Sequence, residues 1–207
     1  RDRSEPYGRE TCLDIGGNIG NHALFFADLF DQVVSFEPNP KIFELLTINS
    51  NLAKNITAVN LGLCDQTDNL PVKVSNLNLG GTRYADPLNA NDSFSTMALD
   101  DYLLSAAPKS ISFIKMAAGG YELRALVGAT ETLQRHQPIL AIELHVRRDQ
   151  SKADAILAFL SKQGYGYAHI FKPKLFSLNK PRFIKIPISE FKDYPVKNHK
   201  IVAFTFD

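Results

Sequence analysis

Short apolar runs alternate along this chain with longer segments whose apolar positions repeat every three or four residues. Runs of the first kind are typical of buried strands, and segments of the second kind are typical of amphipathic helices. Residues 11–64 follow this alternation as strand, helix, strand, helix and strand. Strands separated by helices predict a parallel sheet with right-handed crossovers.

The same alternation resumes at residue 98 and continues to the end of the sequence. Four prolines, the first at 173 and the last at 195, predict a loop before the final strand. The expected strands are residues 110–116, 138–145, 165–171 and 200–206, and the expected helices are residues 98–107, 121–136 and 151–164.

Between these two halves, residues 66–97 are rich in Gly, Asn, Asp and Ser and lose the periodicity. We expect an irregular insertion there, with one edge-strand pattern at residues 70–74. The sequence shows no linker and no repeat, so we expect one domain over residues 1–207. Its predicted fold class is α/β, a Rossmann-like, doubly wound and mostly parallel sheet of about seven strands.

The composition of the chain narrows the range of functions that the protein can have. Apolar residues make up 44% and charged residues 22%, and the net charge is +1, so no overall field favours nucleic acid. No apolar run is long enough to span a bilayer. Cys12 and Cys64 lie in strand-like runs, and we expect buried free thiols and a cytoplasmic location. The basic stretch at residues 172–200 fits either a solvated surface or a rim that favours an anionic substrate.

The strongest chemical pattern is the segment LDIGGNIG, residues 13–20, between the first strand and the first helix. Glycines there allow a tight turn and close approach of a ligand to the backbone. Glu37 ends the second strand, where a carboxylate can accept hydrogen bonds from both hydroxyls of a ribose. This order predicts a nucleoside site. Asn18 and Asn21 replace the second and third glycines of the dinucleotide fingerprint, which counts against NAD and FAD.

Further motifs follow in order: FEPNP at residues 36–40, LDDY at 99–102, IK with GYE and GA between 114 and 129, and PILAIELH at 138–145. Together with DIGGNIG they resemble the FkbM family of S-adenosylmethionine-dependent methyltransferases. The resemblance covers residues 11–150. It implies a seven-stranded sheet whose last strand is antiparallel, and methyl transfer from S-adenosylmethionine to a hydroxyl oxygen of a sugar, polyketide or similar small molecule.

The resemblance also implies roles for individual residues. Four residues of the glycine motif would surround the methionine and ribose portions of the cofactor: Asp14, Gly16, Asn18 and Gly20. Glu37 would hold the ribose hydroxyls, and Asp65 would lie near the adenine amine. Each acid also has a structural interpretation: helix entry for Asp14, an exposed carboxylate for Glu37, and a turn for Asp65. Asp100 and Asp101 fit a helix start better than catalysis.

Glu143 and His145 alternate at the carboxyl end of a predicted strand, so their side chains point to the same side. His145 can accept a hydroxyl proton with Glu143 orienting it, and a structural polar pair is an equal alternative. His22 and His136 are expected to be structural or exposed. No group of residues has metal-ligand spacing.

One segment departs from the family. The family motif Lys-x-Asp-x-Glu-Gly occurs here as KMAAGG, with Ala117 and Gly119 in place of both acids. Lys115 remains and is a third candidate for the catalytic set, beside Glu143 and His145. Loss of the acids should weaken metal binding or proton abstraction. A catalytically inactive module that binds S-adenosylmethionine or a glycan is therefore an alternative, and a nicotinamide-dependent oxidoreductase is a second.

Overall fold

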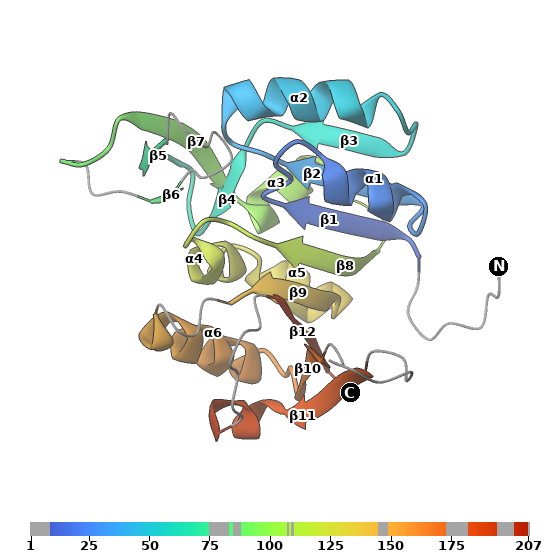
Figure 1. Ribbon diagram of the computed structural model, residues 1–207, viewed down its shortest axis with the longest axis vertical. Helices are drawn as coiled ribbons and strands as arrows, with labels where there is room; N and C mark the ends of the chain where they lie inside the picture. The colour runs from blue at the N-terminus through green and yellow to red at the C-terminus, as the bar shows by residue number, and fades with distance from the viewer. Residues whose placement is uncertain are drawn as a thin grey trace.

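The computed structural model describes residues 9–74, 83–84, 88–106, 108, 110–144, 149–172, 182–193 and 201–206. Its centre is an eight-stranded sheet in the order β11-β10-β12-β9-β8-β1-β2-β3 (Figure 1). The strands are β1 Thr11–Ile15, β2 Gln32–Phe36, β3 Ile56–Val59, β8 Ile111–Met116, β9 Ile139–Glu143, β10 Tyr167–Lys172, β11 Arg182–Pro187 and β12 Ile201–Thr205.

The five strands from β3 to β9 pair in parallel, as the alternation of strands and helices predicts. The last strand, β12, enters between β9 and β10 and is antiparallel to both. The predicted mixed α/β sheet and its antiparallel last strand are therefore confirmed. The sheet has one strand more than the seven expected, because β11 pairs with β10 where the prolines predicted only a loop.

Helices cover both faces of the sheet: α1 Asn21–Ala27, α2 Pro40–Ser50, α3 Leu99–Ser105, α4 Glu122–Val127, α5 Thr130–His136 and α6 Gln150–Lys162. Asn39 begins α2 by accepting a hydrogen bond from the amide of Lys41, and Pro40 occupies the first helical position, where its missing N–H costs nothing. A 3-10 helix, Ile188–Asp193, follows β11.

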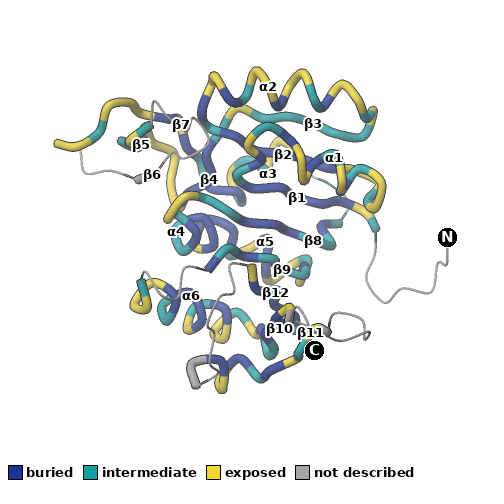
Figure 2. The backbone as a smooth tube through the Cα atoms, viewed as in Figure 1, coloured by how far each residue is buried: buried dark blue, intermediate teal, exposed yellow. Residues whose placement is uncertain are grey.

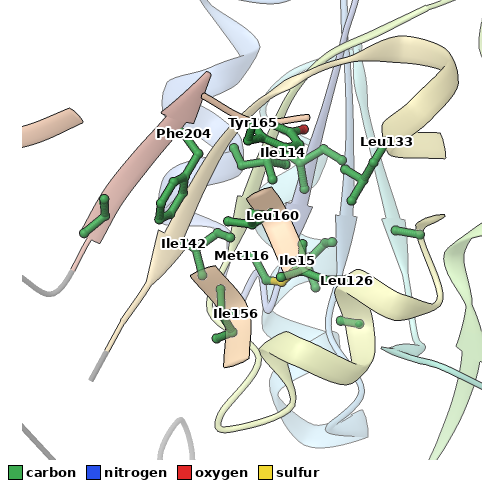
Figure 3. Packing of buried hydrophobic residues seen from close by; sticks show 14 of the residues in the cluster. Ile15, Ile114, Met116, Leu126, Leu133, Ile142, Ile156, Leu160, Tyr165 and Phe204 are labelled. Atoms are coloured by element: carbon green, nitrogen blue, oxygen red, sulfur yellow. The ribbon is translucent and has the colours of Figure 1, made fainter. Parts of the chain in front are cut away.

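Two apolar clusters form the core. The larger one joins Leu13 and Ile15 of β1 to side chains of α3, α4, α5 and α6 on one face of the sheet. Figure 3 shows side chains of this cluster, among them Met116 of β8, Leu126 of α4 and Ile156 of α6. On the opposite face Cys12 and Val33 pack against Phe26 of α1. The central strands are consequently buried along their length, while the side of α2 that faces away from the sheet is exposed (Figure 2).

The predicted insertion is more regular than expected. A second sheet in the order β4-β7-β5-β6 lies beyond the carboxyl ends of the main strands (Figure 1). Its strands are β4 Gly62–Cys64, β5 Asp68–Lys73, β6 Arg83–Tyr84 and β7 Asp92–Ala98. The edge strand predicted at 70–74 corresponds to β5, whereas the prediction of an irregular segment is wrong for β7, which pairs antiparallel with β5. The single strand expected at 56–65 divides into β3 and β4, one in each sheet.

The single helix expected at 121–136 is also divided. It breaks between α4 and α5 at Gly128, where a Cβ atom would overlap the carbonyl oxygen of Cys64. Asp100 accepts hydrogen bonds from the amides of Glu131 and Thr132 and so begins α5, which agrees with the structural role expected for it.

Candidate functional site

The carboxyl ends of β2, β1 and β8 lie side by side, because Ile15 is the register partner of both Phe36 and Met116. Each strand is followed by one of the segments singled out in the sequence. The glycine turn, residues 16–20, follows β1, and Glu37 follows β2. The junction, residues 117–120, follows β8. The parallel sheet thus brings the predicted cofactor residues and the junction, which lacks both family acids, to one edge.

Every backbone amide of the glycine turn is already hydrogen-bonded within the protein. The amides of Gly16 and Gly17 donate to the carbonyl of Phe36, at 3.0 and 2.8 Å, and that of Gly20 donates to the carbonyl of Gly17. The amide of Asn18 donates to Glu37, and the amide of Ile19 to the Asn18 side chain. A phosphate cradle needs unpaired amides, so this turn does not offer one.

The conformation of the turn explains its composition. Gly16 and Gly20 have positive φ angles of 73° and 92°, which only glycine adopts freely. Asn18 has φ of 50°, and asparagine tolerates this region because its short side chain bonds locally. The side chain of Asn49 in α2 donates to the carbonyl of Ile19 and holds the far end of the turn.

Glu37 is buried, and each of its carboxylate oxygens accepts one backbone amide. Oε2 accepts from Asn18 and Oε1 from Asn39, both at 3.0 Å. Burial raises the pKa of Glu37 above its ordinary value, and the two amide hydrogen bonds oppose that rise. Each oxygen of the carboxylate still has a lone pair for a ligand hydroxyl. Glu37 therefore links the glycine turn to the start of α2 and is not the exposed carboxylate of the alternative interpretation.

Asp14 is fully buried and forms an ion pair with Lys115 at 2.9 Å. Its second oxygen, Oδ2, accepts a hydrogen bond from the hydroxyl of Ser35. The Lys115 ammonium also donates to the carbonyl of Gly16 at 2.8 Å and lies 3.4 Å from that of Ile15. The sequence had suggested Asp14 and Lys115 for different halves of the site, but the register of β1 and β8 makes them direct partners.

The junction after β8 packs its backbone against the glycine turn. The amide of Ala117 donates to the carbonyl of Ile15, and a Cβ atom on Gly16 would overlap the carbonyl oxygen of Ala117. Glu122, which is buried, accepts hydrogen bonds from the amides of Ala118 and Gly120 through Oε1. Neither this role of Glu122 nor that of Ser35 was predicted, although a glutamate near a helix start is a known capping signal.

Asp65 follows β4 and is held by Arg124 of α4. Its Oδ1 lies 2.9 Å from Nε and 2.6 Å from a terminal nitrogen of Arg124. The hydrogen bond from Arg124 is the main reason why the pKa of Asp65 is lowered. The neighbouring Cys64 thiol donates to the same carboxylate, and burial raises the pKa of this thiol to about 11. Both cysteines are buried free thiols, as predicted.

Glu143 is the last residue of β9 and pairs with Ile201 of β12. Strand alternation places it on the same face as Ala141, the register partner of Lys115. His145 lies outside the described residues, as do residues 1–8 and most of the basic stretch at 172–200. His136 accepts a hydrogen bond from the amide of Ile111, which is the structural role expected for it.

Within the described residues, no group of three or more His, Cys, Asp or Glu side chains is arranged to hold a metal ion. The helices of that same part of the chain include none with the length and apolar character needed to cross a membrane.

Comparison with known sequences places this site in a family. Residues 14–167 match the methyltransferase FkbM domain. A curated relative, the hexuronic acid methyltransferase AglP of Haloferax volcanii, is 27% identical over 150 residues. That match covers 72% of this chain and 62% of the relative, so the chain spans less than two thirds of its length.

Solved structures agree on the fold. A methyltransferase FkbM from Methylobacillus flagellatus matches with a TM-score of 0.52 and 24% identity, over 73% of this chain and 37% of that chain. A putative methyltransferase from Streptococcus mutans, solved in complex with SAH, matches with a TM-score of 0.51 and 13% identity, over 96% of this chain and 89% of that one.

Proposed function

The chain belongs to the FkbM methyltransferase family, and from that premise we propose that it transfers a methyl group from S-adenosylmethionine to a hydroxyl oxygen of a small acidic sugar. The cofactor, the acceptor and the residue roles are parts of this proposal.

The observation that supports the cofactor best is the saturated glycine turn. Its amides are all used inside the protein, so the turn offers little to a pyrophosphate, which counts against the nicotinamide alternative. S-adenosylmethionine has a ribose but no phosphate, and its sulfonium and ammonium groups require acceptors and negative potential. Glu37 supplies a buried carboxylate at the same edge.

In this proposal Glu37 accepts the ribose hydroxyls, and Gly16, Asn18 and Gly20 shape the backbone against the methionine and ribose portions. Asp65 remains the candidate for the adenine amine. Its Oδ1 is occupied by Arg124, so the contact would use Oδ2. When bound, S-adenosylmethionine supplies a methyl group attached to a positively charged sulfur.

The acidic acceptor is supported by the charge around the junction and by the relative that methylates a hexuronic acid. Lys152 in the first turn of α6 lies close to the junction, with Nζ 3.9 Å from the place where a Cβ atom on Gly120 would stand. Its only described ionic partner is Asp149, at 3.6 Å. Because residues 117 and 119 are alanine and glycine, the junction itself carries no acid there, and the exposed Lys152 lies beside it. A sugar carboxylate would be attracted to it.

Transfer forms a bond between the acceptor oxygen and the methyl carbon, breaks the bond between that carbon and sulfur, and releases the hydroxyl proton. Our candidates for taking this proton are His145 and Glu143, and they rest on the sequence pattern alone. The protein contributes mainly by holding the hydroxyl in line with the methyl group.

The inactive binding module remains a second candidate function, because both family acids of the junction are replaced. It predicts cofactor binding without methyl transfer to any acceptor.

Calorimetry with S-adenosylhomocysteine tests the cofactor, and transfer of a labelled methyl group to glucuronate and to glucose tests the acceptor. We expect binding, and transfer to glucuronate in preference to glucose. Lys152→Gln should raise the KM for glucuronate and leave that for glucose unchanged. No heat at millimolar ligand would exclude the cofactor, whereas binding without transfer to a broad set of sugar acids would favour the binding module.

Restoring the acids tests the junction. Ala117→Asp should be tolerated, whereas Gly119→Glu places a side chain at φ of 63° and should cost about 1–2 kcal/mol of stability. Ala117→Asp is therefore the first variant to assay. An increase in transfer rate or in divalent-ion affinity would identify the lost acid as functional.

A further inference from the structure

We infer that Lys115 is a positioning residue that fixes the glycine turn for the cofactor, and that it is not a proton donor or acceptor in methyl transfer. This inference rests on the proposed function. It changes the role that the sequence suggested for Lys115, and it adds a mechanism by which Asp14 acts on the cofactor turn.

Three oxygen atoms surround the Lys115 ammonium, one through an ion pair and two through hydrogen bonds. Asp14 Oδ1 lies at 2.9 Å, the carbonyl of Gly16 at 2.8 Å and the carbonyl of Ile15 at 3.4 Å. Lysine has three donors and, when charged, no acceptor, so three oxygens match the number of its donors. Only 6% of the residue is exposed. An ammonium that is this enclosed and is surrounded by three protein oxygens is not accessible to an acceptor molecule.

The partners of Lys115 connect the ends of three strands. Lys115 of β8 and Ser35 of β2 are both register partners of Asp14 in β1. Ser35 bonds one carboxylate oxygen of Asp14 and Lys115 pairs with the other. From this buried cluster the ammonium reaches the carbonyl of Gly16, the first residue of the glycine turn.

At Gly16 the hydrogen bond from Lys115 affects the direction of the backbone. Its φ of 73° turns the chain away from β1, and a Cβ atom added to it would overlap the carbonyl oxygen of Ala117. The amide of Gly16 is fixed by Phe36, so the bond from Lys115 fixes the peptide unit on its other side. Lys115 therefore sets the direction in which residues 17–20 leave the sheet.

The test uses a double variant, Asp14→Asn with Lys115→Met, which removes both charges together and keeps similar side-chain volumes. Replacing a buried ion pair by uncharged groups is often neutral for stability, whereas Lys115→Met alone would leave a buried carboxylate without its cation. We expect the double variant to fold and to melt near the native temperature. Its affinity for S-adenosylhomocysteine should fall at least tenfold. In the cofactor-free protein, hydrogen exchange should increase in the peptide that contains residues 16–20, which loss of a direct contact between Asp14 and the cofactor would not cause.

A matched control separates positioning from general stability. Tyr165→Phe removes a buried hydrogen bond to the carbonyl of Pro138. Tyr165 precedes β10, which lies on the other side of β9 from β1 and its glycine turn. It should lower the melting temperature without changing cofactor affinity. A double variant that binds S-adenosylhomocysteine with native affinity would overturn the inference. A native protein that does not bind S-adenosylhomocysteine would instead overturn the proposed function, so the two failures are distinguishable.

Discussion

The glycine turn after β1 and the junction after β8 begin at the same edge of the sheet but are built differently. In the turn, every amide has a partner, and a buried cluster of Asp14, Lys115 and Ser35 lies directly beneath it. In the junction, one carboxylate, Glu122, holds two amides, and Gly119 and Gly120 are exposed.

The geometry of the glycine turn therefore does not require acidic side chains at positions 117 and 119. The turn is held by polar groups of β1, β2 and β8, by Glu37 and by Asn49 of α2, and none of these groups belongs to residues 117–120. The two segments still touch at one point, where Gly16 meets the carbonyl of Ala117. The predictions below test how independent they are.

The largest effect is expected at that contact. Gly16→Ala would place a Cβ at φ of 73° and against the Ala117 carbonyl, so we expect a loss of about 3 kcal/mol or more in the free energy of unfolding, together with loss of S-adenosylhomocysteine binding. The matched change in the junction is Gly119→Ala, at φ of 63°. It should cost about 1 kcal/mol and leave cofactor affinity unchanged. Equal effects of the two variants in urea unfolding and calorimetry would contradict the comparison.

A smaller loss is expected when the carboxylate that holds two amides of the junction is removed. Glu122→Ala takes away the acceptor of two amides and should lower the free energy of unfolding by about 2 kcal/mol. Glu122→Gln keeps a carbonyl oxygen at the same place and should lose less than half as much. Hydrogen exchange at residues 118 and 120 should rise in the alanine variant only. An unchanged exchange rate would show that other groups hold the junction.

The third prediction concerns pH. The pKa of Glu37 is raised above 4.5, chiefly by burial. Between pH 4.5 and the native pKa, Glu37 is therefore mostly protonated in the native state and mostly ionised in the unfolded chain. The stability contribution of Glu37 therefore falls as pH rises through this window. Binding of ribose hydroxyls needs the carboxylate, so affinity for S-adenosylhomocysteine should fall by up to about tenfold per pH unit below the native pKa.

Glu37→Gln provides the control for this measurement. It keeps one acceptor oxygen but cannot titrate, so its weaker binding should not vary with pH over the same range. Calorimetry across a pH series measures both proteins. The same acid dependence in the variant would assign the titration to another group.

The smallest effect is expected at the partly exposed ion pair of Asp65 and Arg124. Arg124→Gln should lower the free energy of unfolding at pH 7 by about 0.5 kcal/mol, since exposed pairs are screened by solvent. Because the pKa of Asp65 is lowered, this contribution is present above about pH 4 and is lost as pH falls through the native value. The difference in unfolding free energy between the two proteins should therefore shrink as pH falls below about 4; a constant difference would contradict the assignment.

Much of the fold could be read from the order of apolar runs. The parallel strands, the antiparallel last strand implied by the family resemblance, and the helices α3 and α6 all lie where the sequence places them. The divided segments could not be read in this way. Gly128 ends α4 because it passes the carbonyl of Cys64, and that neighbour is more than sixty residues away in the chain. Pairing of β11 with β10 likewise depends on a distant partner, and it overrides the prolines that predicted a loop.

For the site, the sequence by itself determined which residues lie at the edge: the glycine motif, Glu37 after the second strand, and the absence of acids at 117 and 119. It determined these because a strand followed by a helix fixes where the chain turns. Only the tertiary structure decided what each side chain does there. Strand register pairs Lys115 with Asp14, and the contact with Ala117 explains Gly16 without any ligand. Such roles depend on distances between segments up to about a hundred residues apart, which local pattern does not specify.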